Sequence, residues 1–170
     1  TSLRVGLRFS LPVPPGAFII AAFMSFVIGS GDELSPVSLA ISVENTSDAL
    51  GFPVPDHAGT VEGYLRDRPR GAQRIPWEDV SPAVGQAGMP LPSEDISDLL
   101  QDLVSSPLWL PGAHVNVIIE ANASNTEVGR REFEGARGRG PELVVFYLPV
   151  VDSTHLTEFS IVVEEVHIRR

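Results

Sequence analysis

The sequence predicts an all-β protein: an antiparallel jelly-roll β-sandwich of about eight or nine strands with one short helix near residues 94–105. Three observations lead to this prediction. Short segments with apolar residues at alternate positions recur along the chain, separated by turn residues. Glycine and proline are frequent, at 15 residues each, and favour a loop-rich β architecture. Only one segment carries the periodicity of an amphipathic helix.

The strands are expected where apolar residues alternate between turn signals. The first follows the start of the chain, the second is a long apolar run after a Pro-Val-Pro-Pro-Gly turn, and later ones are shorter. Pro76 cannot donate a hydrogen bond to a ladder, so its strand is expected at a sheet edge. The expected strands cover residues 3–11, 17–28, 37–44, 60–65, 74–80, 115–120, 131–134, 142–148 and 157–168.

The one expected helix carries a single apolar stripe. Its apolar residues from Ile96 to Leu103 fall at positions i, i+3, i+4 and i+7. Ser93 is a candidate N-cap, and the acidic residues that follow it suit the positive end of a helix dipole. Pro107 ends the segment.

The run from Ala17 to Ile28 is the most informative feature of the chain. It is apolar on both faces, interrupted only by Ser25, yet too short for a membrane-spanning helix, which needs about 20 apolar residues. Membrane insertion is therefore not expected. As a strand it needs a bulge to place its apolar residues consistently, and Phe18 and Ile20 fall on the face away from Ile19. Either both faces are covered within the domain or another molecule covers one of them.

Charge and composition exclude several classes of protein. The net charge of -10 argues against a nucleic-acid partner, because phosphate binding needs clustered cations. All 12 basic residues are arginine, and cysteine is absent, so disulfide and thiolate chemistry are excluded. The 170 residues suffice for one domain with a sizeable core. We assign residues 1–150 to the sandwich and residues 151–170 to a linker with an extra strand.

A resemblance emerges from the order of short motifs. VGLRF is followed by P-x-G-A before a long strand, an S-L-x-I strand, R-x-R near a tryptophan, D-I-S-D-L-L-Q-D-L-V-x-x-P-x-W, and P-x-L-V-V-F-Y. Over residues 5–148 this resembles a β-sandwich module of secreted and cell-surface proteins, akin to DNRLRE-type and jelly-roll carbohydrate-binding modules. The resemblance implies a non-catalytic extracellular module, often one of several in a long chain.

Two departures from that pattern suggest assembly. Such modules usually have a strand before VGLRF, so the strand-like C-terminus is expected to fill that place in this module or in a neighbouring one. In the related modules the outward positions of the long strand are largely polar, whereas here they are apolar, which favours an interface. The expected interface residues are Phe18, Ile20, Phe23, Val27, Phe159, Ile161 and Val163.

Tryptophan and arginine residues supply the main alternative, a carbohydrate-binding module. Trp77, on an expected edge strand, could stack on a sugar ring, whereas Trp109 is expected in the core because large aromatic residues are mostly buried. The arginine-rich segment from Arg66 to Arg74, shortly before Trp77, could hold an acidic sugar, pair with acidic groups of a neighbouring molecule, or simply be solvated. The possible carbohydrate contacts are therefore Trp77, Arg66, Arg68, Arg70 and Arg74.

Other patterns are weaker. The sequons at Asn45 and Asn122 are candidate N-glycosylation sites. No cofactor is expected, although scattered carboxylates leave a structural calcium open. The four histidines lack metal-ligand spacing, and no nucleophile–base pair emerges, so an enzyme is the least favoured class. The leading interpretation is an extracellular structural or adhesive module that assembles with copies of itself or adjacent domains into a surface structure or filament. The first alternative is the carbohydrate-binding module, and the second is a viral or phage capsid jelly roll.

Overall fold

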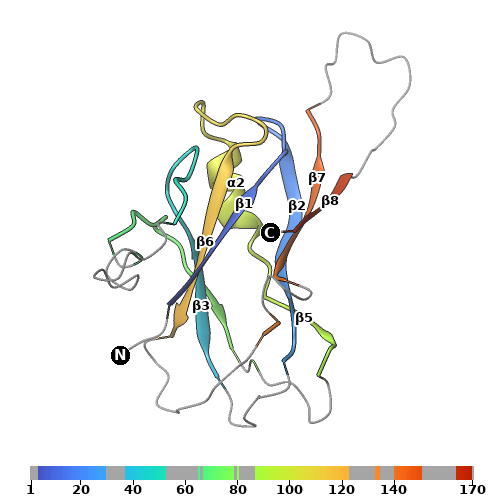
Figure 1. The fold of residues 1–170 in the computed structure, drawn as a ribbon. Helices are drawn as coiled ribbons and strands as arrows, with labels where there is room; N and C mark the ends of the chain where they lie inside the picture. The colour runs from blue at the N-terminus through green and yellow to red at the C-terminus, as the bar shows by residue number, and fades with distance from the viewer. Residues whose placement is uncertain are drawn as a thin grey trace.

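The computed structural model describes most of the chain and arranges it as two antiparallel sheets and one helix (Figure 1). The described residues are 4–29, 37–52, 65, 67–78, 80, 87–122, 133–134 and 140–150, together with the backbone of 164–169. The prediction of a mostly β protein with one short helix is confirmed over these residues.

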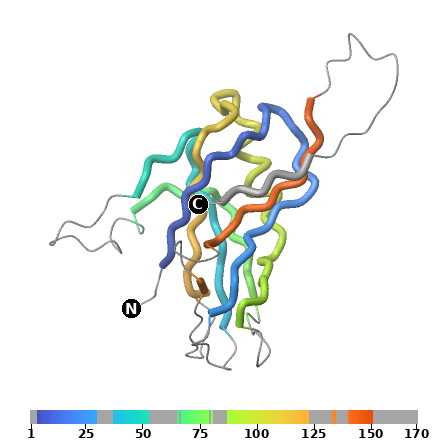
Figure 2. The backbone as a smooth tube through the Cα atoms, turned by 45° about the vertical axis from the view of Figure 1, so that its right-hand side comes forward, coloured from blue at the N-terminus to red at the C-terminus, as the bar shows by residue number. Residues whose placement is uncertain are grey.

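The two sheets have four strands each. The first sheet has the order β1-β6-β3-β4, and the second sheet has the order β5-β2-β7-β8. Most neighbours in a sheet are far apart in sequence, as Figure 2 shows for β1 beside β6 and β2 beside β7. The strands are β1 (Arg4–Ser10), β2 (Phe18–Val27), β3 (Leu39–Val43), β4 (Ile75–Trp77), β5 (Pro90–Pro92), β6 (His114–Ala121), β7 (Glu142–Leu148) and β8 (Glu164–Arg169).

One hydrophobic core joins the inner faces of both sheets. Phe9 of β1, Ile41 of β3 and Val117 of β6 meet Met24 of β2 and Leu143 of β7. The alternation of these strands therefore reflects a buried inner face, as the sequence predicts.

Trp109 closes one end of this core. Its side chain is 1% exposed, and its indole Nε1 donates a 2.9 Å hydrogen bond to the Val13 carbonyl oxygen. A buried indole N–H needs such an acceptor. The predicted core position of Trp109 is confirmed.

The helix α2 (Ser97–Val104) is shorter than expected and starts differently. It buries an apolar stripe that includes Leu99, Leu100 and Leu103, as its periodicity predicts. The prediction of Ser93 as N-cap is wrong. Ile96 occupies the N-cap position without a side-chain cap, and the Ser93 hydroxyl accepts a hydrogen bond from a strand instead.

That strand is β2, whose open edge the helix segment covers. β5 pairs with β2 only at residues 25–27, so the earlier backbone amides face the segment 93–101. The side chains of Ser93, Asp95 and Gln101 accept hydrogen bonds from the amides of residues 24, 22 and 19, at 2.9, 3.0 and 2.8 Å. Uncovered sheet edges favour aggregation, and these polar side chains satisfy the edge within the chain.

A bulge in β2 gives its two faces different environments. The register against β7 shifts between Ile19 and Ala21, so Ile19, Ala22 and Met24 all point into the core. The expected bulge is confirmed. Phe18 and Ile20 are left outside.

The C-terminal strand pairs within its own chain. β8 runs antiparallel to β7 and forms an edge of the second sheet, with Val145 opposite Val166. The expected place for this strand was before β1, which lies in the first sheet, whereas β8 lies in the second; exchange with a neighbouring module stays a prediction. Of the expected strand 60–65 only Leu65 is described, and it is helical, so the strand prediction is wrong at that residue. Of the expected strand 131–134, the described part contributes an isolated bridge between Phe133 and Ile28.

Candidate functional site

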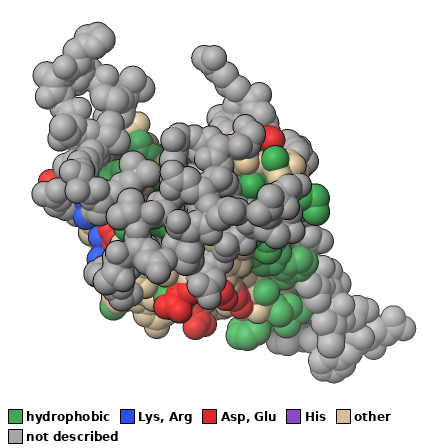
Figure 3. Space-filling model, turned by 90° about the horizontal axis from the view of Figure 1, so that it is seen from below, with side chains coloured by type: hydrophobic (Ala, Val, Ile, Leu, Met, Phe, Trp, Pro, Cys, Tyr) green, Lys and Arg blue, Asp and Glu red, His purple; other side chains and the backbone are tan. Residues whose placement is uncertain are grey.

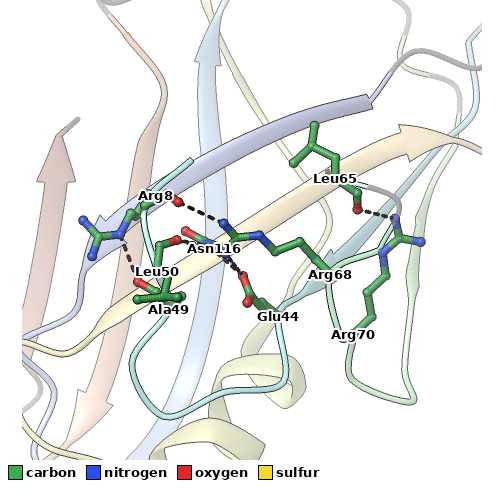
Figure 4. A network of polar contacts seen from close by, with 9 residues as sticks. Arg8, Glu44, Ala49, Leu50, Leu65, Arg68, Arg70 and Asn116 are labelled. Atoms are coloured by element: carbon green, nitrogen blue, oxygen red, sulfur yellow. Dashed lines mark hydrogen bonds and ion pairs between the residues drawn. The ribbon is translucent and has the colours of Figure 1, made fainter. Parts of the chain in front are cut away.

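A buried ion pair fixes the segments that cover the outer face of the first sheet. The Arg68 Nη1 lies 2.7 Å from the Glu44 Oε2, and the side chains of both residues are less than 10% exposed. The Asn116 Nδ2 donates to the same oxygen at 2.7 Å (Figure 4). A buried carboxylate needs such partners, because its desolvation is costly.

The same guanidinium anchors a neighbouring loop. Arg68 donates to the carbonyl oxygens of Leu50 and Gly51, each at 2.9 Å, and lies over the Phe52 ring at 5.1 Å from the ring centre. On the strand below, a Cβ at Gly6 would lie 2.6 Å from the Phe52 ring, so only glycine leaves room for this contact. Arg68 is therefore a structural residue. Of the possible carbohydrate contacts, Arg68 is 8% exposed and is engaged by Glu44 and by the loop it anchors.

A second cluster gathers three arginines around one carboxylate. The Glu120 carboxylate lies 3.0 Å from Arg4 Nε, 3.1 Å from Arg70 Nη1 and 2.7 Å from Arg74 Nη1. The side chain of Glu120 is 7% exposed, whereas that of Arg74 is 53% exposed. These groups border a cavity of about 380 Å³. We call it the arginine cavity.

The structure brings only part of the predicted carbohydrate site together. Arg70 and Arg74 line the arginine cavity, and Arg66 lies outside the described residues. Trp77, a possible carbohydrate contact, takes the core position instead: its side chain is 4% exposed, and the centroid of its ring lies 5.4 Å from that of the Phe26 ring, on which it stacks. β4 is at a sheet edge as predicted, but the inner face of an edge strand still packs into the core.

The outer face of the second sheet is apolar. Phe18 and Ile20 are 61% and 43% exposed, Phe23 is half-buried, and the Phe23 ring lies 6.2 Å from that of Phe146. Leu148 is the register partner of Phe18 and shares its face. We call Phe18, Ile20, Phe23, Phe146 and Leu148 the outer apolar face. In Figure 3 hydrophobic side chains gather on the right, the side of the second sheet, and arginines are visible on the left, the side of the first.

Two other parts of the predicted interface stand apart from this face. Val27 is 8% exposed, so the expectation of an open side chain there is wrong. Neighbouring segments flank the end of β2 on both sides. Val27 pairs with Pro90 of β5, and the Val27 carbonyl oxygen accepts a hydrogen bond from the Glu134 amide. Phe159, Ile161 and Val163 lie outside the described residues.

An exposed pair of titratable groups sits at the start of β6. The Asp48 Oδ1 accepts a 2.8 Å hydrogen bond from the His114 amide and lies 3.0 Å from its Nδ1. The amide hydrogen bond, supported by the imidazole, lowers the pKa of Asp48 below its ordinary value.

The predicted glycan acceptors lie at strand ends. Asn45 is exposed two residues after the end of β3, and Asn122 is half-buried directly after β6. The glycosylation of either residue remains a prediction.

No group of three or more His, Asp or Glu side chains is placed to hold a metal ion within the described part of the chain. In the same part, no helix combines the length and apolar character needed to cross a bilayer.

Several residues of both polar clusters were missed by sequence reasoning. Glu44, Asn116 and Glu120 are polar residues within otherwise apolar strand segments. Polar residues inside an apolar strand segment are the signal in the sequence that could have indicated this arrangement. Because charged side chains are rarely buried without a partner, such residues indicate that other polar groups cover that face of the sheet.

Comparison with known proteins gives no relatives: no family model, curated protein or solved structure matches this chain.

Proposed function

We propose that this chain is a non-catalytic extracellular structural or adhesive module that packs against copies of itself or sister domains through the outer apolar face. The single observation that carries the proposal is the exposure of Phe18 and Ile20 on a strand whose inner face is already filled. Contiguous exposed apolar side chains on a soluble domain usually mark an interface.

The energetics favour burial of this face. Covering a large apolar side chain stabilises an interface by about 1.5–3 kcal/mol. Val150, two residues after β7, is a further exposed apolar side chain at 62%, and its Cγ2 lies beside Gly16, two residues before β2. A stable interface buries about 1,200–2,000 Å² in total, so these residues would form the centre of a larger contact.

The extracellular setting and the jelly-roll class are proposed from the sequence motifs described above. The alternation of successive strands between the sheets, from β1 to β2 to β3, is compatible with a jelly roll. A filament is one outcome of such packing, because head-to-tail contacts form open chains when the rotation does not close. The carbohydrate-binding alternative with Trp77 as its platform is not carried forward, since that ring is buried.

The test is the association state of the purified chain, measured by light scattering over a range of concentrations. We expect the wild type to associate and the double variant Phe18→Thr, Ile20→Thr to shift to monomer while keeping its melting temperature. The matched control is Leu108→Thr with Leu110→Thr, which removes two apolar side chains that are even more exposed, at 73% and 69%, from the loop after α2. A monomeric wild type, or equal loss of association in the control, would overturn the proposal.

A further inference from the structure

The connection between α2 and β6 presents two exposed leucines at one end of the sandwich. Leu108 and Leu110 are 73% and 69% exposed, and they flank Trp109, which is buried. The two leucines therefore stand in solvent on either side of a side chain that anchors the loop in the core. We call residues 106–113 the leucine loop. It lies at the same end of the molecule as the connection from β1 to β2 (Figure 1).

Two consecutive β-turns hold the leucine loop in one shape. In the first turn the Trp109 amide donates a 3.0 Å hydrogen bond to the Ser106 carbonyl oxygen. In the second the Ala113 amide donates to the Leu110 carbonyl oxygen, also at 3.0 Å. Proline is the second residue of each turn, and Gly112 supplies the positive φ of 84° that a type II turn requires. A loop of fixed shape loses little conformational freedom on binding.

The leucine loop is also tied to the connection between β1 and β2. The Gly112 amide donates a 2.9 Å hydrogen bond to the Leu11 carbonyl oxygen, in addition to the indole hydrogen bond of Trp109. Pro12 and Pro15 of that connection are themselves exposed. The exposed apolar side chains at this end thus stand on a hydrogen-bonded backbone, and their exposure does not result from a loose loop.

The two segments that form this tip carry no charge. Residues 9–17 and 103–113 contain no charged side chain, in a chain that is 20% charged. A charged group would have to be desolvated to enter an apolar medium, at a high cost in free energy. Leucine and proline side chains carry no such cost, so this tip can leave water more easily than an average part of the surface.

We propose that the leucine loop adsorbs to the surface of an electrically neutral phospholipid bilayer. A bilayer accepts apolar side chains from a protruding loop without a matching pocket, and binding grows with the apolar area that enters it. A specific protein interface buries about 1,200–2,000 Å² in total, which is more than a few loop side chains supply. The net charge of -10 disfavours anionic lipids, because like charges repel. This contact is peripheral, requires no membrane-spanning helix, and does not depend on the assembly proposal.

The test is flotation of the full chain with phosphatidylcholine vesicles at low salt. We expect the wild type to float with the vesicles. The double variant Leu108→Thr, Leu110→Thr should bind at least about tenfold more weakly, because two apolar side chains no longer enter the bilayer. Each single variant should show intermediate binding. Phosphatidylserine added to the vesicles should weaken the binding of the wild type, since the chain is acidic.

Met89→Thr is the matched control. Met89 is 53% exposed at the opposite end of β2, where its carbonyl oxygen accepts a hydrogen bond from the Ile28 amide. This variant should bind vesicles as the wild type does, and the melting temperature of each variant reports whether it folds.

Several outcomes would overturn the proposal. These are a wild type that does not float, unchanged binding in folded single or double leucine variants, and equal weakening in Met89→Thr. Stronger binding to vesicles that contain phosphatidylserine would overturn the assignment to a neutral bilayer. Loss of self-association in the double leucine variant without lipid would assign the leucine loop to a contact between copies of this chain.

Discussion

Replacing Arg68 with methionine is the most informative change to the fold. Methionine keeps the long apolar stem but removes the guanidinium, and with it the ion pair to Glu44 and the hydrogen bonds to the carbonyl oxygens of Leu50 and Gly51. Asn116 then remains as one donor to a carboxylate that is still buried.

The expected loss of stability is large. Removing one partner of a buried ion pair costs about 3–5 kcal/mol, because the other charge is left uncompensated. That is a large share of the about 5–15 kcal/mol by which domains are stable, so the variant should remain folded only with a small margin. A second substitution, Glu44→Gln, removes the stranded charge and should recover part of the loss.

The assay is equilibrium unfolding in urea, which gives the free energy of unfolding by linear extrapolation. Arg74→Gln is the control, because its ion pair involves a side chain that is 53% exposed and should contribute at most about 1 kcal/mol. A cost for Arg68→Met no larger than that of Arg74→Gln, or a double variant less stable than Arg68→Met alone, would refute the reasoning.

Two further predictions concern the contacts around this network and at the start of β6. Gly6→Ala should destabilise the fold by about 1–3 kcal/mol, because its Cβ would lie 2.6 Å from the Phe52 ring. Urea unfolding should show a smaller cost of Gly6→Ala when Phe52→Ala is also present. Equal costs with and without Phe52→Ala would contradict the packing argument. Asp48→Asn should lower stability at neutral pH, where the carboxylate is charged. Since its folded-state pKa is lowered, that contribution is present above the unfolded pKa and is lost as the pH falls through the folded value, so melting curves of the variant and wild type should converge in acid. A difference independent of pH would contradict this.

Much of the fold follows from local patterns. The position of β7 and the bulge in β2 were predictable because strand periodicity and the side chain's preference for the core act over a few residues. The core position of Trp109 followed from its size. The start of α2 was not predictable in the same way. The Ser93 hydroxyl accepts a hydrogen bond from the Met24 amide of β2, and the Asp95 carboxylate accepts from the Ala22 amide of β2 as well as from the Ser97 amide, so contacts distant in the sequence decide where the helix begins.

The arginine cavity required the tertiary structure. The sequence marks Arg70 and Arg74 as part of a basic segment but gives no sign that Arg4 joins them, because the residues meet only through the pairing of β1 with β6. Trp77 shows the opposite case, in which a residue that looks open along the chain is covered by Phe26 of the other sheet.

The amino-acid sequence by itself determined the β class, the apolar excess on β2 and the helix α2, because these depend on periodicity and residue type. Only the tertiary structure decided which arginines are structural and which border a cavity. Burial and ion pairing are set by what packs across the sheets, and in this chain most of those partners lie far apart in sequence.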